Sequence, residues 1–343
     1  MNLRMSKESV VKLTHGDGSL ATLRLIKEKI VSRFNNPILS SLEDGCQIDT
    51  RSSKIIVSSD SYIVDPIIFP GGDIGKLSIT GTVNDLLASG AIPQYITLNL
   101  ILSEGLEMAI VDRILDSIKM TADSAGVNIV AGDTKVLNAN SQIEIIISTT
   151  GFGIPAREGV DYAVSKAEIG DDIIVTGTIG DHSLTILSMR EGLGYEQRIS
   201  SDCAALDRLI IPLFNDFTGI RCMRDPTRGG LTGVLCDIAE SSSVDLHIDE
   251  NKIPIKHEVQ YGCEMLGIDP LGLVNEGKMV IVVDPSQSNS ILNVLRKDVL
   301  GIDSVVIGKL HKKKDPIACV ILKNGRTSKL LQRPEGASIP RLC

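Results

Sequence analysis

The sequence has no tryptophan, and aromatic residues make up only 3% of its 343 positions. Side chains on which nucleic-acid bases stack are therefore scarce. Positive charge is in deficit as well: the formal net charge is −8, and the one clear basic run, Lys312 to Lys314, is short. Because a nucleic-acid surface needs a continuous band of positive charge, we expect no nucleic-acid partner.

Long apolar stretches are also missing. No run approaches the roughly 20 apolar residues that a membrane-spanning helix needs. The first residues, MNLRMSKES, contain no signal-peptide core. We therefore expect a cytoplasmic protein with no membrane association.

Paired cysteine motifs are absent too. The cysteines stand at positions 46, 203, 222, 236, 263, 319 and 343, without a Cys-x-x-Cys pair among them. This odd number argues against a disulfide framework and against a structural zinc site. We interpret most of them as small core residues. Cys343 differs, because it is the final residue of the sequence.

What is present suits a folded protein of two domains, at roughly 100–200 residues each. Strands and helices alternate loosely, with several strands adjacent, which favours an α+β fold of two α/β domains with mixed sheets. Residues 151–159 contain Pro155 and three glycines, and we place the domain boundary there. The expected units are an N-terminal domain at 1–153, a C-terminal domain at 154–331 and a flexible tail at 332–343. In the C-terminal domain we expect helices at 183–190, 202–214 and 231–239 and strands at 171–176, 244–248, 279–283, 305–309 and 317–322.

The most informative stretch is residues 54–90. Ile55 to Val57 is an apolar, β-branched run typical of a buried strand, and Asp60 follows it. Ile74 to Leu87 then has the apolar spacing of a helix, with Asp73 as its expected N-cap.

Asn84 and Asp85 lie in the body of this predicted helix, among apolar residues. Such a polar pair is either an internally satisfied network or a site, and we favour a site in which Asp60 and Asp85 flank one ion. The alternative is that both carboxylates only cap local structure.

Two further acidic residues stand in glycine-containing stretches. Asp133 follows the short strand predicted at Val127 to Val130, in the sequence AGDTK. Asp225 lies in MRDPTRGGL, directly before a predicted helix, and the backbone amides at a helix N-terminus bind anions readily. An acid there suits a phosphate that arrives with Mg²⁺. Together with Asp60 and Asp85, these residues favour an enzyme that uses Mg²⁺ and a nucleotide.

The polar segment THGDGSL, residues 14–20, precedes a predicted helix. Its amides can wrap a phosphate. A flexible N-terminal turn is an equally good interpretation of these residues alone.

Several longer motifs occur in one order along the chain: DSYIVDPIIFPGGDIGKLSITGTVNDLLASGAIP, AGDTKV, GTIGDHS, RDPTRGGL, NEGK and a final PRLC. This string resembles the HypE family of hydrogenase maturation factors, and the resemblance runs from His15 to Cys343. The wider superfamily includes aminoimidazole ribonucleotide synthetase and selenophosphate synthetase. The resemblance implies an aminoimidazole ribonucleotide synthetase-like, ATP-binding fold that dimerises through its N-terminal half.

The resemblance also implies an activity. In this family a carbamoyltransferase, HypF, loads a carbamoyl group onto the terminal cysteine, here Cys343. ATP-dependent dehydration then gives a thiocyanate, whose cyanide goes to iron held by the HypC–HypD complex during assembly of the NiFe-hydrogenase site. We therefore expect a homodimer with HypF-like and HypC–HypD-like partners, and ATP and Mg²⁺ as cofactors.

The same motifs imply the residues of the site. The expected Mg²⁺ ligands are Asp60, Asp85, Asp133 and Asp225. The residues expected to bind the nucleotide are His15, Gly16, Gly18, Lys76, Asn84, Gly132, Thr134, Gly229 and Gly230. The expected catalytic residues are Cys343, Glu276 and Lys135.

The chemistry fits these residue types. An amide oxygen becomes a good leaving group after phosphorylation, and Mg²⁺ with Lys135 can spread the charge that develops. Loss of phosphate also requires removal of the amide protons, and Glu276, in the motif NEGK, is the candidate base. The alternative for Glu276 is an ordinary ion pair with Lys278. His182 can assist, although an isolated histidine is more often structural.

Two other functions compete with this interpretation. One is a related ATP-dependent synthetase of the same superfamily, but selenophosphate synthetases carry their reactive residue near the N-terminus, and the first cysteine here is Cys46. The other is a non-catalytic assembly protein whose tail only docks on a partner. The four acidic residues and the AGDTK segment argue against it.

Overall fold

The computed structural model describes residues 9–15, 20–34, 36–39, 48, 54–138, 143–194, 197–315, 317–325 and 327–332. Three residues of the predicted site, Gly16, Gly18 and Cys343, lie outside these ranges, as does the predicted tail from residue 333 onward.

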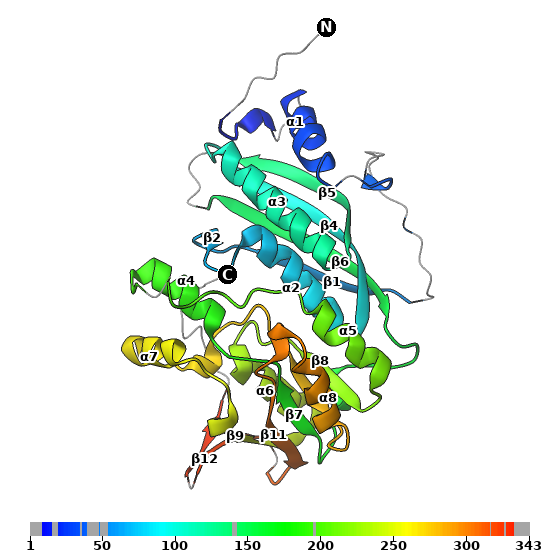
Figure 1. Ribbon diagram of the computed structural model, residues 1–343, viewed down its shortest axis with the longest axis vertical. Helices are drawn as coiled ribbons and strands as arrows, with labels where there is room; N and C mark the ends of the chain where they lie inside the picture. Colours follow the sequence, from blue (N-terminus) through cyan, green and yellow to red (C-terminus); the bar gives the residue numbers. More distant parts are fainter. Residues whose placement is uncertain are drawn as a thin grey trace.

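Within the described residues, the strands form two main sheets, which Figure 1 shows in the upper and lower halves of the molecule. The upper sheet consists of β1 (Ile56–Tyr62), β4 (Ala91–Ser103), β5 (Asn128–Leu137) and β6 (Ile145–Pro155), in the order β1-β6-β4-β5. The lower sheet consists of β7 (Asp172–Val175), β8 (Ile220–Arg224), β9 (Val244–Asp249), β10 (Val280–Val283), β11 (Val305–Lys312), β12 (Val320–Asn324) and β13 (Thr327–Leu331). Its order is β13-β12-β9-β11-β7-β10-β8, and a short pair, β2 (Ile68–Phe69) and β3 (Gly72–Asp73), stands apart.

Both main sheets are mixed. β4 and β5 are parallel in the upper sheet, β9 and β12 are parallel in the lower one, and the other neighbours are antiparallel. The predicted α+β fold of two α/β domains with mixed sheets is therefore confirmed. The last strand of the upper sheet continues to Pro155, so the boundary expected between residues 153 and 154 falls within the end of β6.

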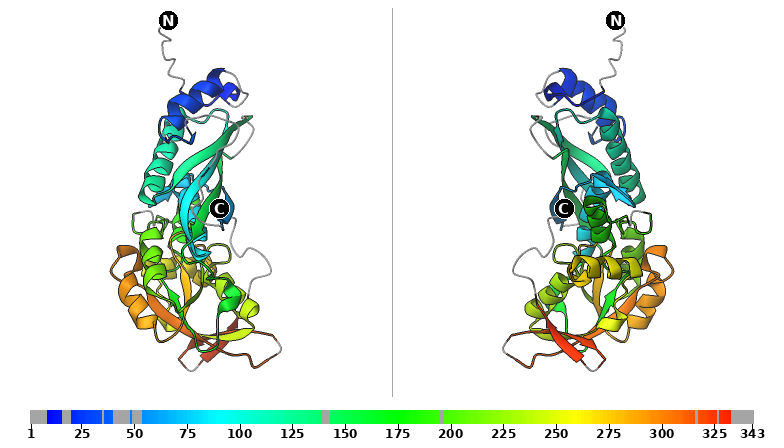
Figure 2. Two further views of the ribbon diagram at one scale, coloured as in Figure 1. Left: turned by 90° about the vertical axis from the view of Figure 1, so that its right-hand side faces the viewer. Right: turned by 90° about the vertical axis from the view of Figure 1, so that its left-hand side faces the viewer.

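The helices of the N-terminal half lie on one face of its sheet, as the side views in Figure 2 show. They are α1 (Leu20–Leu25), α2 (Ile74–Ala88) and α3 (Met108–Ser124). The C-terminal half contains α4 (Asp181–Glu191), α5 (Asp207–Asp216), α6 (Gly230–Ser242), α7 (His257–Leu266) and α8 (Ser288–Leu295). None of the helices in the described ranges is long and apolar enough to cross a membrane.

Helix α2 is the central element of the fold. Its predicted N-cap is confirmed: the Asp73 side chain accepts a hydrogen bond from the Lys76 amide at 2.9 Å. Almost every residue of α2 is buried, because the helix lies between the upper sheet and the C-terminal half. A helix buried on all sides has no solvated face, so its polar residues must find partners inside the protein.

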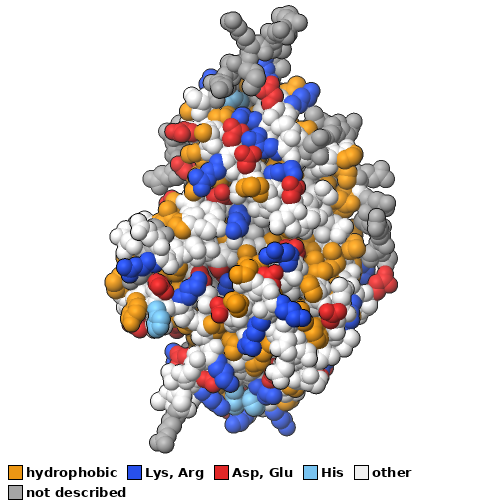
Figure 3. Space-filling model, in the orientation of Figure 1, with side chains coloured by type: hydrophobic (Ala, Val, Ile, Leu, Met, Phe, Trp, Pro, Cys, Tyr) orange, Lys and Arg blue, Asp and Glu red, His pale blue; other side chains and the backbone are white. Residues whose placement is uncertain are grey.

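The two halves share one apolar core. A single cluster of buried side chains joins Leu98 and Leu115 of the N-terminal half to Leu209, Phe214 and Ile281 of the C-terminal half. A second cluster packs α6 against the lower sheet. The surface seen in Figure 3 carries acidic and basic side chains interspersed with apolar ones.

Two sequence predictions about strands are wrong. Asp60 lies inside β1 rather than after a strand, and Asp133 lies inside β5 rather than in a loop. Gly132 and Asp133 have low strand propensity, which is why the sequence predicted a strand ending at Val130. The structure requires glycine at position 132 because an added Cβ would lie 2.0 Å from the carbonyl oxygen of Leu98 on the neighbouring strand.

The C-terminal half also differs from the prediction in its helices. The helix predicted at 202–214 begins only at Asp207, so residues 201–206 form an irregular segment. The helix predicted from Ser183 begins earlier, and Asp181 and His182 belong to the first turn of α4. Strands β8 and β13 and helices α7 and α8 were not predicted.

Candidate functional site

Four acidic side chains from distant parts of the chain come together where the two halves meet. Asp60 lies on β1, Asp85 lies on α2, Asp225 follows β8, and Glu276 lies in the loop before β10. They are close enough to interact electrostatically, since the charges of the three aspartates all raise the pKa of Glu276. We refer to these four residues as the acidic cluster.

Asp85 is the best connected member of the acidic cluster. Its Oδ2 accepts a hydrogen bond from Ser58 Oγ at 2.7 Å. Burial, reinforced by the negative charge of Asp225, raises the pKa of Asp85 to about 8. Burial likewise raises the pKa of Asp225. Asp85 and Asp225 therefore hold protons more tightly than ordinary carboxylic acids do.

Glu276 is fully enclosed, and its pKa lies well above the ordinary value for a glutamic acid. Burial is the largest cause, followed by the negative charges of Asp202 and Asp225. The ion pair that Asp60 makes is weak: Arg228 Nη2 lies 3.5 Å from Asp60 Oδ1, but the Arg228 side chain is 88% exposed. Exposed pairs of this kind contribute little.

The alternative in which Asp60 and Asp85 act only as caps is wrong. The N-cap of α2 is Asp73, and neither Asp60 nor Asp85 caps a helix in the described ranges. Buried carboxylates without adequate counter-charge repel one another, and a cation relieves that repulsion. In the described part of the chain, however, no three His, Cys, Asp or Glu side chains are arranged closely enough to enclose a metal ion by themselves.

Asp133 and Lys135 do not join the acidic cluster within one chain. Asp60 is opposite Thr149 in the sheet, and Thr149 is opposite Leu98, which pairs with Gly132. Because side chains alternate along a strand, the residue after Gly132 faces the opposite side of the sheet. There the Asp133 carboxylate forms an exposed ion pair with Lys135 Nζ at 3.2 Å.

The other predicted nucleotide-binding residues lie at several places. Thr134 is buried on β5, and Lys76 Nζ donates to the Gly71 carbonyl at 2.8 Å. Gly229 and Gly230 lie directly at the start of α6, both with positive φ, as a tight turn into the helix requires.

His15 is buried in a short 3₁₀ turn at the N-terminal end of the described chain. Its Nδ1 accepts a hydrogen bond from the Lys12 amide at 3.0 Å. The neighbouring glycines of the predicted phosphate loop fall outside the described residues.

Asn84 connects α2 to both loops of the C-terminal half that surround Glu276. Its Nδ2 donates to the carbonyl oxygens of Ala204 at 3.0 Å and Glu276 at 3.4 Å, and its Oδ1 accepts from the Leu206 amide at 2.9 Å. The polar position in the apolar helix is thus satisfied internally, and it holds the Glu276 loop beside Asp85.

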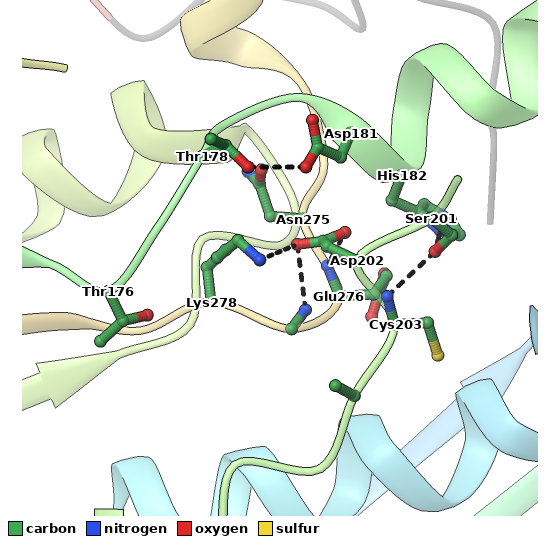
Figure 4. Close-up of polar contacts among 12 residues, drawn as sticks. Thr176, Thr178, Asp181, His182, Ser201, Asp202, Cys203, Asn275, Glu276 and Lys278 are labelled. Carbon is green, nitrogen blue, oxygen red and sulfur yellow. Dashed lines mark hydrogen bonds and ion pairs between the residues drawn. The ribbon is translucent and has the colours of Figure 1, made fainter. Parts of the chain in front are cut away.

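Asp202, whose contacts are drawn in Figure 4, was not among the predicted site residues. Its side chain is 2% exposed, and its Oδ2 lies 3.6 Å from Lys278 Nζ. The ion pair that Lys278 makes is therefore to Asp202 rather than to Glu276. Residues 202–206 were predicted as helix, and no local pattern relates them to a loop more than 70 residues away.

His182 lies beside this segment and has a structural environment. Burial lowers the pKa of His182 to about 4, so its ring is neutral at physiological pH. Nδ1 is 2.8 Å from Ser201 Oγ, and the ring packs edge-on against Phe69 at 5.4 Å between centroids. The side chain thus links α4 to β2 and to residues 201–203.

Comparison with known proteins agrees with this architecture. Residues 42–155 match the model of the AIR synthase related protein N-terminal domain, and residues 168–320 match that of the C-terminal domain. A thiamine-monophosphate kinase from Stenotrophomonas maltophilia has the same fold, with a TM-score of 0.65 at 22% identity over 87% of this chain and 95% of that chain. The protein thus has the two-domain fold of the AIR synthase related proteins.

Closer relatives define the family. The chain is 38% identical to the carbamoyl dehydratase HypE of Escherichia coli over 97% of its own length and 99% of that protein. A crystal structure of the hydrogenase maturation protein HypE in complex with ATP matches 96% of this chain and 99% of that chain, with 39% identity and a TM-score of 0.92. A crystal structure of a HypE–HypF complex matches 90% of this chain and 99% of that chain, with 38% identity and a TM-score of 0.78. The chain belongs to the HypE family of carbamoyl dehydratases, which are hydrogenase maturation enzymes.

Proposed function

We propose that this protein dehydrates an S-carbamoyl group on its own Cys343 to a thiocyanate, at the expense of ATP. The product supplies the cyanide ligand for the iron of NiFe hydrogenase during maturation. The observation that carries the proposal is the convergence of Asp60, Asp85, Asp225 and Glu276 between the two halves of a chain that belongs to the HypE family.

The acidic cluster suits a nucleotide whose phosphates arrive with Mg²⁺. The carboxylate oxygens of Asp60, Asp85 and Asp225 are the hard ligands that Mg²⁺ takes, and phosphate oxygens and water complete its coordination. This explains how the site can bind the ion without enclosing it with side chains alone. When bound, Mg²⁺ neutralises the charge that develops on the transferred phosphoryl group. Asp133 completes the predicted ligand set only if a second chain is present.

The backbone around the cluster supports the same assignment. Gly229 and Gly230 open α6 beside Asp225, and a helix N-terminus favours a bound phosphate. His15, Gly16, Gly18, Lys76, Asn84, Gly132 and Thr134 remain the other predicted nucleotide-binding residues. The contacts of Asn84 favour a role in positioning the Glu276 loop, since its side-chain amide already forms hydrogen bonds with Ala204, Leu206 and Glu276.

The reaction runs in two steps. In the first, the carbonyl oxygen of the carbamoyl group attacks the γ-phosphate of ATP, ADP leaves, and the amide nitrogen releases one proton to water. In the second, Glu276 takes the remaining N–H proton, the C–O bond breaks with loss of phosphate, and the nitrile forms. The oxygen of the lost water thus ends in the phosphate. A base acts only where a proton moves, so Glu276 belongs to turnover rather than to binding.

A homodimer would bring Asp133 and Lys135 to a site. In the described residues, the helices of the N-terminal half cover only one face of its sheet. The other face carries Val57, a residue that is 55% exposed, with partly exposed Tyr95 and Phe152 beside it. Covering such an apolar face with a second copy buries it. Each chain's Asp133 and Lys135 would then face the partner chain, where Lys135 can meet the transferred phosphoryl group.

The proposed partners follow from the chemistry of the tail. A carbamoyltransferase similar to HypF loads Cys343, and the crystal structure of a HypE–HypF complex at 38% identity supports this pairing. An iron-carrying complex similar to HypC–HypD then receives the cyanide. Cysteine is required because a thiolate is a good nucleophile and its sulfur can release cyanide to iron. The cytoplasmic location expected from the sequence stays a prediction.

The test is to replace Cys343 with alanine and present the protein to its partner carbamoyltransferase with the carbamoyl donor. Intact-protein mass spectrometry is expected to detect the carbamoyl group on the unchanged protein and none on Cys343→Ala. Cys319→Ala is the matched control, because Cys319 is partly exposed yet lies in the lower sheet region, away from the acidic cluster. A Cys343→Ala variant that still accepts the group and yields cyanide would show the proposal to be wrong.

A further inference from the structure

The loop that carries Glu276 is fastened by one buried side chain. The two carboxylate oxygens of Asp202 accept hydrogen bonds from successive backbone amides: Oδ1 from Glu276 and Oδ2 from Gly277, each at 3.2 Å. Oδ2 also lies 3.6 Å from Lys278 Nζ. Figure 4 shows Asp202 reaching from residues 201–203 to this loop. One carboxylate thus holds three consecutive residues.

The backbones of the two segments are in direct contact. A Cβ added to Gly277 would lie 1.9 Å from the carbonyl oxygen of Asp202, so only glycine fits there. In the other direction, the Ala204 amide donates to the Glu276 carbonyl at 3.4 Å. Asn84 bonds both of these residues from α2. The position of Glu276 relative to Asp85 is therefore fixed through residues 202–204.

Asp202 also acts on Glu276 through its charge. After burial, its negative charge is the largest cause of the raised pKa of Glu276, ahead of Asp225, Asp60 and Asp85. Lys278 is 9% exposed and carries the counter-charge on the far side of Asp202. A negative charge beside a buried glutamate is unfavourable, so hydrogen bonding to two amides does not by itself explain why an acid stands at position 202.

We propose that Asp202 is a positioning residue for the reaction: its carboxylate holds Glu276 in place through the hydrogen bonds to the Glu276 and Gly277 amides. This inference rests on the proposed role of Glu276 in dehydration. Asp202 touches neither the substrate nor ATP in this scheme, so its loss acts on turnover and leaves nucleotide binding intact.

The test is a double-mutant cycle with Asp202→Asn and Glu276→Gln, assayed by dehydration of the carbamoylated protein. Asn keeps the size of the side chain but can no longer accept from both amides. We expect Asp202→Asn to lower kcat by about 100-fold, the cost of a misplaced catalytic group, with the KM for ATP unchanged. The double variant is expected to be no slower than Glu276→Gln alone, because both changes disable one base.

A matched control is Asp181→Asn. Asp181 is equally buried, with its side chain 2% exposed, and it also pairs with a lysine, Lys256, at 2.7 Å. It is not among the main causes of the raised pKa of Glu276. Its replacement should leave kcat within a few-fold of that of the unchanged protein. The control thus separates the loss of a buried aspartate in general from the loss of Asp202.

The outcomes separate the two proposals. If Glu276→Gln turns over normally, the role of Glu276 is wrong. If Glu276→Gln is slow but Asp202→Asn is normal, or if the two losses multiply in the double variant, the inference about Asp202 is wrong. Should Asp202→Asn fail to fold, Asp202→Glu moves the carboxylate by one methylene and keeps its charge. The inference then requires kcat to fall with KM for ATP unchanged, and an unchanged kcat overturns it.

Discussion

The acidic cluster and the Asp133–Lys135 pair differ in burial and in counter-charge, although both place an aspartate near the middle of a strand in the same sheet. Asp60 faces α2 and shares its surroundings with Asp85, whose pKa is raised to about 8. Asp133 faces the opposite side and forms an exposed ion pair with the lysine two residues along. Within a sheet, one residue of offset decides which face a side chain serves.

The difference has a consequence for ligands. The Asp133–Lys135 pair carries its own counter-charge and is solvated, so it needs nothing further to be stable. In the acidic cluster, Glu276 is buried and the three aspartates are half-buried, and the exposed Arg228 compensates their charge poorly. A site of this kind trades folding stability for the ability to bind a cation.

Replacing one aspartate of the acidic cluster and one of the Asp133–Lys135 pair tests this comparison. The cluster variant should give the largest loss of activity. We expect Asp85→Asn to lower Mg²⁺-dependent ATP turnover by at least about 100-fold, since a carboxylate ligand stabilises the phosphoryl charge by several kcal/mol. Because the pKa of Asp85 is raised in the folded protein, folding at neutral pH must bind a proton there, and Asn removes this cost, so the thermal midpoint measured without Mg²⁺ should rise. Turnover at limiting Mg²⁺ is the measurement. Normal turnover in Asp85→Asn would remove the acidic cluster from the mechanism.

Asp133→Asn is the matched partner of that variant. If Asp133 acts only across a dimer, its replacement should weaken turnover in the dimer without raising the thermal midpoint, because Asp133 is exposed and ion-paired. A rise in midpoint equal to that of Asp85→Asn would show that the two regions do not differ as described.

A charge placed on the open face of the upper sheet tests whether that face forms the interface with a second copy of the chain. Val57→Asp puts two carboxylates into a twofold interface, where like charges cost several kcal/mol. The dissociation constant of the dimer should therefore rise by about 100-fold or more. Sedimentation at micromolar concentration should then detect monomers. Ile302→Asp is the control, because Ile302 is similarly exposed, at 60%, but lies in the C-terminal half. Dimers that persist in Val57→Asp, or a monomer before mutation, contradict the proposed interface.

The smallest expected effect concerns His182, which lies near the site but has only structural contacts. Its pKa of about 4 in the folded protein is below the unfolded value of 6.5. The stability it contributes is therefore present above pH 6.5 and is lost as the pH falls towards 4, by about 3 kcal/mol. The His182→Asn variant should therefore lose less stability than the unchanged protein as the pH falls from 6.5 towards 4. Urea unfolding at several pH values measures the difference, and parallel pH profiles would refute it.

Local patterns in the sequence were enough to predict part of this architecture. The helix at Ile74 to Leu87, its Asp73 cap and the mixed sheets all follow from apolar spacing and capping chemistry, which act between near neighbours. Four cysteines are core residues as predicted: Cys203, Cys222, Cys236 and Cys263 are buried.

Features that depend on distant contacts were missed. β5 continues through Gly132, where the close approach of the neighbouring strand at Leu98 leaves room only for glycine. The sequence of β5 itself does not show this contact. Asp202 is functional in our account because it bonds amides 74 and 75 residues further along the chain. No spacing rule relates such positions, so only the folded structure brings them together.

The central claim is that the acidic cluster and Glu276 drive ATP-dependent loss of water from a carbamoyl group on Cys343. The most direct measurement is intact-protein mass spectrometry of the carbamoylated protein after ATP and Mg²⁺ are added. The account predicts that the unchanged protein loses the mass of one water, whereas carbamoylated Glu276→Gln binds ATP but keeps its mass. Loss of water at the normal rate in Glu276→Gln, or without ATP in the unchanged protein, would contradict the account.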